Sequence, residues 1–307
     1  MELRQLEYFM AVCEELHFTR AAEKLNIAQP TLSQQIKILE NEIGIPLFDR
    51  IGKRIALTEA GKILWKHSKQ VFYELEQAQA AIGELNGLER GKLTIGSLLT
   101  CMSYLLPTAI VKFKEFYPNI ELSIRGLRAE EIEQEILENE LDLGLTFLPN
   151  DHEDLNSIPL YTEELALGVP KHHPLAKESV VNFNIISHVP MVLMPKNYQL
   201  RQLLDAYCSE AEITVTPTLE LTTLESITQM VAKGVGMTIL PLPYLEHLNH
   251  KEIKIVKLLD PTPQREIGII YRKDKFMCTA TRTFIEQALD TIQNEEMLHY
   301  GSFRVRP

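Results

Sequence analysis

The stretch LNIAQPTLSQQIKILE, residues 25–40, gathers small polar side chains at the start of a predicted helix. Apolar residues recur there at intervals of four and three, which predicts one buried stripe. The other face carries Gln29, Thr31, Ser33, Gln34 and Lys37. An ordinary solvated helix would carry mainly Glu and Lys at such positions. Amide and hydroxyl groups at a helix start are instead suited to hydrogen bonds with base edges in the major groove of DNA.

Two helices predicted before this stretch would position it. Residues 3–16 have an amphipathic pattern, and Thr19 can cap a short second helix over TRAAEKL. Pro30 falls in the first turn of the third helix, where its missing N–H costs nothing. Two short helices joined by a turn of about three residues predict a helix-turn-helix. Spacing alone leaves open a plain three-helix bundle with a polar surface.

A basic turn follows the polar helix. GIPLFDRIGKRIALTEAG, residues 44–61, alternates like a short β-hairpin and carries three cations around Gly52. Such a tip suits the phosphate backbone or the minor groove of DNA, although a charged turn is often only solvated. The candidate DNA contacts are Thr19, Arg20, Gln29, Pro30, Thr31, Ser33, Gln34, Lys37, Arg50, Lys53 and Arg54.

The charge distribution supports two separate tasks. The formal net charge of the 307 residues is -11, which taken alone argues against nucleic acid. Residues 16–66 nevertheless hold eight Lys and Arg against five Asp and Glu, while acidic runs such as residues 130–142 lie elsewhere. A basic segment on an acidic chain predicts that one domain binds DNA and another does not.

The expected compartment is the cytoplasm. No apolar run approaches the roughly 18 residues that a membrane span needs, and the N-terminus lacks the pattern of a secretory signal. The four cysteines are widely spaced and form no CxxC pair, which is typical of buried thiols in a reducing compartment. We therefore expect no membrane, no cofactor and no metal site.

One long helix is predicted from Ala60 to about Leu88. Its apolar residues are spaced close to a heptad, which predicts pairing with a second copy of the chain. A dimer would present two reading helices to a two-fold DNA site. Packing of the helix on its own C-terminal half is the alternative. The glycines of LNGLERGKL, residues 85–93, then predict a hinge.

Beyond residue 90 the pattern alternates between strands and helices. This alternation predicts a parallel sheet with helical crossovers, which is an α/β domain. A second, similar unit follows, so we expect two α/β lobes. The rival interpretation is that this part is an enzyme or a solute-binding module and that the N-terminal part only dimerises. No nucleophile elbow, P-loop or HExxH motif is present, and no enzymatic activity is expected.

The chain resembles the LysR-type transcriptional regulators from residue 1 to about residue 293. The family's N-terminal signature is matched at Phe18, Ala21, Ala22, Leu25, Gln29, Ser33, Leu39, Glu40, Leu47, Phe48, Arg50, Leu57, Thr58, Ala60 and Gly61. The resemblance implies a winged helix-turn-helix (1–61), a linker helix and hinge (62–90) and a two-lobed sensor like a periplasmic binding protein (91–307). Lobe I would comprise about 91–161 and 267–293, and lobe II about 162–266. It also implies homodimers, usually homotetramers, with promoter DNA, a small effector and RNA polymerase as partners.

The same resemblance supplies candidate effector-binding residues at strand ends and helix starts. They are Thr100, Cys101, Arg128, Thr146, Gln199, Arg201, Thr223 and Ser226. Hydroxyl groups and arginines at such places favour a small anion. The peroxide-sensing branch of the family has Cys immediately before Leu-Arg in the second lobe, but here Gln199 precedes Leu200 and Arg201. Its redox pair is therefore not expected, and a pairing of Cys101 with Cys208 is a weak alternative.

Overall fold

The computed structural model describes residues 1–51, 54–85, 91–293 and 303–304. Two compact units divide the chain, unit 1 over 1–82 and unit 2 over 83–307. In the part of the chain that is described, no helix is long and apolar enough to cross a lipid bilayer.

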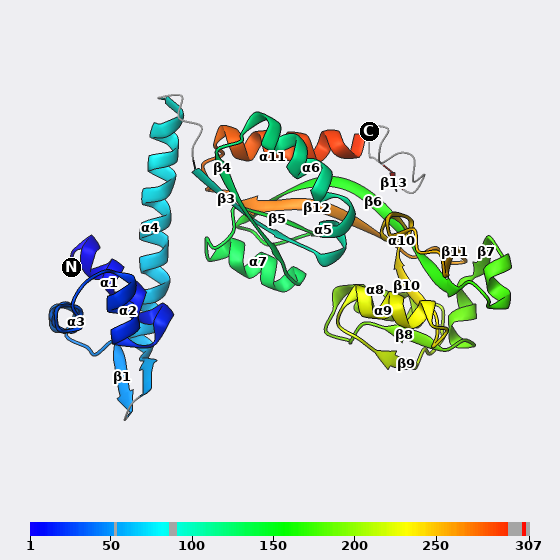
Figure 1. Cartoon of the computed structure of the whole chain (residues 1–307), viewed down its shortest axis with the longest axis horizontal. Coiled ribbons are helices and arrows are strands. Elements are labelled where there is room, and N and C mark those ends of the chain that lie inside the picture. Colours follow the sequence, from blue (N-terminus) through cyan, green and yellow to red (C-terminus); the bar gives the residue numbers. More distant parts are fainter. Residues whose placement is uncertain (52–53, 86–90, 294–302, 305–307) are drawn as a thin grey trace. The chain divides into compact units, whose positions relative to one another are not determined.

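Unit 1 is a winged helix-turn-helix with a long C-terminal helix. Its elements are α1 (Leu3–Glu15), α2 (Phe18–Lys24), α3 (Gln29–Ile43), β1 (Phe48–Ile51), β2 (Arg54–Leu57) and α4 (Glu59–Leu85) (Figure 1). The three short helices enclose one apolar core whose fully buried members include Phe9, Val12, Leu32, Ile36 and Leu39. The predicted stripe of the third helix is thereby confirmed.

The predicted cap of the second helix was wrong. The helix begins at Phe18, and the residue before it, His17, accepts the N–H of Arg20 on its side chain. Phe18 is buried and packs edge to face on Phe48, with ring centres 5.9 Å apart, so the helix begins two residues earlier than predicted. Thr19 is left on the exposed side of α2.

The hairpin is tied to the helices by side-chain hydrogen bonds. Glu40 on α3 accepts the N–H of Leu47 at 2.8 Å, just before β1. Thr58 donates to the carbonyl of Pro46 and accepts the N–H of Gly61, so that it caps α4. A Cβ on Gly61 would lie 2.2 Å from the carbonyl oxygen of Leu47, so only glycine fits there.

Unit 2 is an α/β structure of two lobes. In chain order its elements are β3 (Gly91–Ser97), α5 (Leu99–Tyr104), α6 (Leu106–Phe116), β4 (Ile120–Gly126), α7 (Ala129–Leu137), β5 (Leu143–Leu148), β6 (Leu155–Pro170), η1 (Pro174–Lys177), β7 (Val180–Asn182), η2 (Phe183–Ser187), β8 (Met191–Leu193), α8 (Gln199–Glu210), β9 (Pro217–Glu220), α9 (Leu224–Ala232), β10 (Thr238–Pro241), α10 (Leu242–Leu248), β11 (Ile253–Leu259), β12 (Gln264–Arg272), α11 (Thr279–Gln293) and β13 (Phe303–Arg304). Figure 1 shows α6 and α11 on one face of the first lobe's sheet and α7 on the other.

The sheet is mixed rather than wholly parallel, which corrects the expectation from the strand–helix alternation. Its strands run in the order β4-β3-β5-β12-β6-β11-β7, with β10 and β13 also paired to β6. β4, β3 and β5 are mutually parallel, and β7 is parallel to β11, whereas β12 is antiparallel to both β5 and β6. The late strand β12 returns to the first lobe from the second, and this return reverses its direction.

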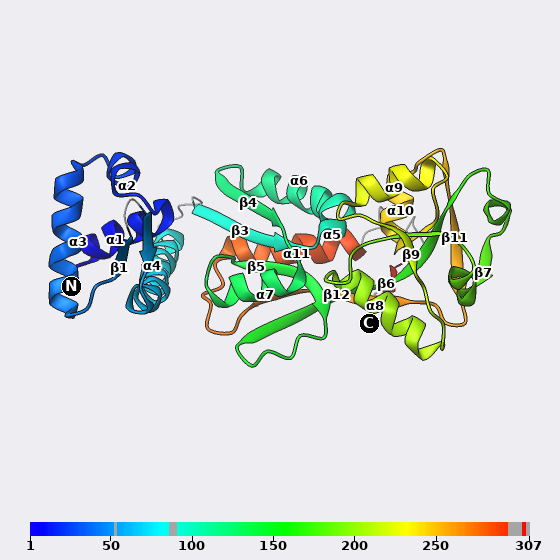
Figure 2. The ribbon, with the colours of Figure 1, turned by 90° about the horizontal axis from the view of Figure 1, so that it is seen from below.

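Strand β6 joins the two lobes. Its first half pairs with β12 up to Glu164, and its second half pairs with β10 and β11 from Leu165 onward (Figure 2). The lobe on the β4-β3-β5-β12 side is called lobe I, and the lobe that holds β7 to β11 is called lobe II. Because β6 and the segment that leads from β11 into β12 both connect the lobes, a change of twist at this junction would move one lobe against the other.

Candidate functional site

The outer face of α3 is polar and accessible. Gln29, Pro30, Thr31, Gln34 and Lys37 are exposed, and Ser33 is half-buried. The amide of Gln29 donates to the hydroxyl of Ser33 at 2.7 Å, which aligns two of these groups on the helix start. Ala28 before the helix offers no side-chain cap, so backbone N–H groups of the first turn stay open to an outside acceptor.

The flanking candidates are placed differently. Thr19 and Arg20 lie exposed on α2, and the guanidinium of Arg20 donates to the carbonyl of Glu15 at 2.7 Å. The backbones of Arg50 and Arg54 lie in β1 and β2. Their side chains, and Lys53 entirely, lie outside the described residues.

Helix α4 leaves an apolar strip uncovered within unit 1. Val71 and Leu75 are exposed and, together with Leu3 of α1, line a shallow groove. Ile82 further along the helix is 60% exposed. Leu64, which the heptad spacing included in this strip, instead packs partly buried against the core of the three short helices.

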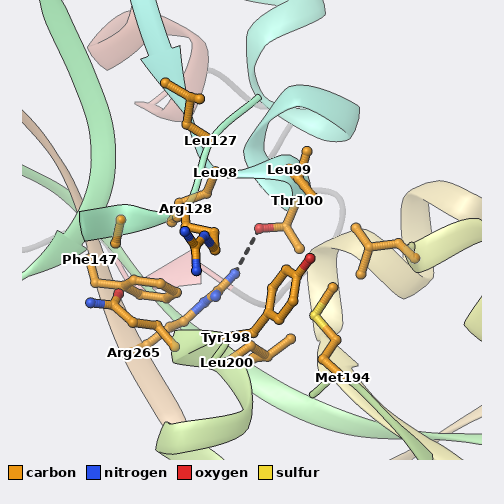
Figure 3. A pocket seen from close by; sticks show the side chains of 13 residues that line it. Leu98, Leu99, Thr100, Leu127, Arg128, Phe147, Met194, Tyr198, Leu200 and Arg265 are labelled. Atoms are coloured by element: carbon orange, nitrogen blue, oxygen red, sulfur yellow. Dashed lines mark hydrogen bonds between the residues drawn. The ribbon is translucent and has the colours of Figure 1, made fainter. Parts of the chain in front are cut away.

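A cavity lies between the two lobes of unit 2. It encloses about 440 Å³ of empty space, part of which is open solvent. The side chains that line it are Leu98, Leu99, Thr100, Leu127, Arg128, Ala129, Phe147, Met194, Tyr198, Gln199, Leu200, Leu224 and Arg265 (Figure 3). Four helices begin at this cavity, namely α5 and α7 from lobe I and α8 and α9 from lobe II.

Helix α8 presents an open N-terminus to the cavity. Tyr198, Gln199 and Leu200 line the cavity, and Tyr198 supplies no side-chain cap to the twelve-residue helix. The first backbone N–H to bond within the turn is that of Arg201, which donates to the carbonyl of Tyr198. The N–H groups before it and the positive end of the helix therefore favour an anion.

Arg265 is the most constrained charged group of the cavity. Its side chain is 4% exposed, and its Nε donates to Glu163, which is fully buried. Its Nη2 donates to the hydroxyl of Thr100 at 3.0 Å, and its guanidinium lies 4.6 Å from the centre of the Phe147 ring (Figure 3). Burial is the largest single influence and lowers the pKa of Arg265. The charge of Glu163, smaller contributions from Tyr104 and Cys101 and the hydrogen bond with Glu163 together outweigh burial, so the pKa is raised and Arg265 stays protonated.

Behind this ion pair lies a chain of buried hydroxyl groups. Tyr104 donates to the second carboxylate oxygen of Glu163, and the hydroxyls of Tyr104 and Tyr161 are 2.7 Å apart. The thiol of Cys101 lies 3.9 Å from both hydroxyls. Burial raises the pKa of both tyrosines well above the ordinary value and that of Cys101 to about 11. These groups are therefore neutral at physiological pH and leave Glu163 and Arg265 as the charged pair.

Arg128 stands at the outer side of the cavity. Its side chain is 41% exposed and pairs with Glu131 at 2.6 Å in the first turn of α7. The hydrogen bond with Glu131 raises the pKa of Arg128 and lowers that of Glu131. Arg128 and Arg265 are the two charged side chains among those that line the cavity, and both are cationic.

The predicted effector residues are only partly brought together. Thr100, Arg128 and Gln199 line the cavity. Cys101 and Thr146 are buried outside this lining. Arg201 is buried in lobe II between Asp205, Glu220 and the carbonyl of Met194, all within 3.0 Å. Thr223 caps α9 on the N–H of Ser226, and both side chains are exposed outside the lining.

Sequence reasoning missed Arg265 and Tyr198. Arg265 precedes an apolar strand and Glu163 interrupts another, and a buried charge inside a strand pattern is the signal that was available. The two lie directly opposite each other on β12 and β6, 102 positions apart in sequence. No group of three or more His, Cys, Asp or Glu among the described residues is arranged to hold a metal ion.

Both units of the chain match models of known protein families. The model of the LysR substrate binding domain matches residues 86–293, and that of the bacterial regulatory helix-turn-helix protein, lysR family, matches residues 3–62. The uncharacterized HTH-type transcriptional regulator YybE of Bacillus subtilis is 33% identical over 92% of this chain and 97% of its own length. The hydrogen peroxide-inducible genes activator of Haemophilus influenzae is 30% identical over 89% of this chain and 91% of its length. A full-length OxyR variant from Pseudomonas aeruginosa superposes with a TM-score of 0.75 at 26% identity, covering 100% of this chain and 99% of that one.

Proposed function

The chain belongs to the LysR family of DNA-binding transcriptional regulators, and we propose how its two units divide that work. Unit 1 reads promoter DNA with α3, and unit 2 binds a small anion between its lobes. Like its relatives the chain is a regulator and not an enzyme, so the enzymatic alternative is set aside.

The observation that carries the DNA-reading proposal is the polar face of α3 over a fully buried stripe. Gln29 and Ser33 offer amide and hydroxyl groups to base edges, and Lys37 lies one turn further on toward the phosphates. Arg50, Lys53 and Arg54 of the hairpin would add phosphate or minor-groove contacts, and Thr19 and Arg20 further backbone contacts.

We assign the apolar strip of α4 to a homodimer. A two-fold pair would cover Val71, Leu75 and Ile82 and present two copies of α3 to a symmetric DNA site. Assembly of two dimers into a tetramer, contact with RNA polymerase and a cytoplasmic location belong to the same proposal. So do the limits 1–61, 62–90 and 91–307 for the DNA-binding domain, the linker and the sensor.

The anion proposal rests on the cavity between the lobes. An uncapped helix start and two arginines face it, and no acidic side chain is among its described lining. Anion binding across lobe I and lobe II would favour one relative position of the lobes. The twist of β6 and β12 would pass this preference to the oligomer and so to the spacing or bending of bound DNA.

A nuclease footprint on the DNA upstream of the protein's own gene tests the DNA-reading part. We expect protection of a two-fold sequence that weakens steeply as salt rises, because phosphate contacts release counterions. Loss of protection in Lys37→Gln at moderate salt, with normal folding, would support the role of this face. Complete absence of protection at low salt on that DNA and on random genomic fragments would contradict it.

A further inference from the structure

We propose that the effector is an organic carboxylate with an uncharged, apolar body. This inference rests on the proposed function, since it names the class of anion that the cavity accepts. It excludes inorganic oxyanions, free amino acids and sugars as the main ligand.

The walls of the cavity are predominantly apolar. Seven of its lining side chains are large hydrocarbon or thioether groups, namely Leu98, Leu99, Leu127, Phe147, Met194, Leu200 and Leu224. They come from both lobes, so a ligand that spans the cavity meets apolar surface on each side. Covering this surface with the hydrocarbon part of a ligand removes apolar area from water and is therefore favourable.

The charged end of the ligand has a defined place beside Arg265. Nε and Nη2 of Arg265 are already engaged with Glu163 and Thr100, and its ring contact with Phe147 fixes the plane of the guanidinium. Nη1 donates to no acceptor among the described residues, so its N–H groups remain for an incoming oxygen. A carboxylate matches such planar donors, and it would meet the positive end of α8 from the other lobe.

Each arginine of the cavity is paired with a carboxylate, Arg265 with Glu163 and Arg128 with Glu131. The net positive charge that the cavity offers to a ligand is therefore small. A single negative charge is therefore better matched than the two charges of a phosphate. An inorganic phosphate would also leave the apolar walls facing water.

The lining offers no partner for a positively charged group on the ligand. No Asp or Glu is among the described lining residues, so the ammonium of an amino acid would lose its hydration without a partner. A sugar would bury several hydroxyls against leucines. Gln199 offers one uncharged site, since its Oε1 is buried and has no hydrogen-bond partner among the described residues. A hydroxyl or a water can donate to this oxygen, whereas an anion cannot.

Calorimetric titration of the full-length protein with matched probes tests the proposal. Hexanoate and cyclohexanecarboxylate supply the charge and two shapes of apolar body. Hexanamide removes the charge, 6-aminohexanoate adds an ammonium, and inorganic phosphate removes the body. We expect both carboxylates to bind and raise the melting temperature, and the other three probes to bind about tenfold more weakly or not at all.

Two pairs of variants locate the binding. Arg128→Gln should weaken hexanoate several-fold, whereas Arg125→Gln should not, because Arg125 has a similar exposure and acid partner but lies outside the lining. Leu99→Ser should weaken cyclohexanecarboxylate, whereas Leu259→Ser, which changes an exposed leucine on β11, should not. Arg265→Gln would leave Glu163 buried without its ion-pair partner, so this variant would report on folding rather than on binding.

The outcomes separate this inference from the proposed function. Binding of phosphate but of neither carboxylate would overturn the apolar-body inference and leave an anion effector in place. Equal binding of 6-aminohexanoate and hexanoate would also overturn it. Absence of binding by every anion in protein that still protects its DNA would overturn both the inference and the anion effector.

Discussion

The face of α3 and the cavity of unit 2 use polar groups in opposite ways. On α3 the polar groups are exposed and stand on a buried apolar stripe, which would suit a partner that is itself charged and hydrated. In the cavity a few polar groups stand at the ends of apolar walls, and Arg265 is held rigid by a buried acid. The first arrangement suits salt-dependent binding to a long polyanion, and the second suits recognition of one small molecule.

This difference predicts where a single substitution unfolds the protein. Glu163→Ala should destabilise unit 2 by about 3–5 kcal/mol, because Arg265 is then buried without its acid partner. Urea unfolding followed by tyrosine absorbance reports this loss. Glu252→Ala removes the exposed partner of Lys171 and should change stability by about 1 kcal/mol or less. Equal effects of the two variants would show that the Glu163 pair is not critical.

Unit 1 has its own sensitive position, which depends on shape rather than charge. Gly61→Ala places a methyl group against the carbonyl of Leu47 and the side chain of Leu57, and should cost about 1–3 kcal/mol. The fluorescence of Trp65, the single tryptophan, follows unfolding of this unit. Gly91→Ala meets no atom within 4 Å and serves as the control. If Gly61→Ala were as stable as the wild-type protein, the backbone at Leu47 would have to lie further from residue 61 than the structure shows.

A smaller effect is expected at the cap of α4. Thr58→Val keeps the shape of the side chain but removes its hydrogen bonds to Pro46 and Gly61, and should cost about 1 kcal/mol. The same tryptophan signal in urea measures it. Thr222→Val alters an exposed threonine of unit 2 and should leave unit 1 unchanged. If the Thr58→Val protein were as stable as the control, the hydrogen bonds of Thr58 would not stabilise unit 1.

The smallest effect concerns the thiols. Burial raises the pKa of Cys101 and Cys208 from 9.0 to about 11, so the folded state favours the neutral thiol. This contribution to stability is complete below pH 9 and is lost as the pH rises through about 11. Alkylation of the native protein at pH 8 should therefore be slow at both positions. Rapid labelling there, or a change in DNA binding after mild peroxide treatment, would favour a thiol-based sensor instead.

The two regions also differ in how far sequence predicts them. The buried stripe and polar face of α3 follow from a local period of 3.6 residues, so both could be predicted and were confirmed. The cap at Thr19 was not, because burial of Phe18 against Phe48, thirty positions away, decides where α2 begins. Residues of the cavity come from seven separate segments, and the pairing of Arg265 with Glu163 depends on a strand returning from lobe II. Local pattern contains no information on such a return.

The prediction of strands was limited in the same way. Taken by itself, the apolar run LALGVP, residues 165–170, predicts a short strand. β6 instead extends over Leu155–Pro170 because it pairs with different partners at its two ends. The polar and mixed residues of its first half are stabilised by β12, which lies about a hundred positions later. Length and direction of these strands are therefore tertiary properties.

The most direct test of the central claim is the DNA affinity of Gln29→Ala and Ser33→Ala, measured by fluorescence anisotropy on the footprinted site. Gln35→Ala lies on the same helix outside the predicted set and is the matched control. We expect each of the first two variants to lose about 1–3 kcal/mol of binding, roughly fivefold to 150-fold in Kd, on the specific site but not on random DNA. Unchanged affinity of both variants for the specific site would contradict the claim that the face of α3 reads DNA sequence.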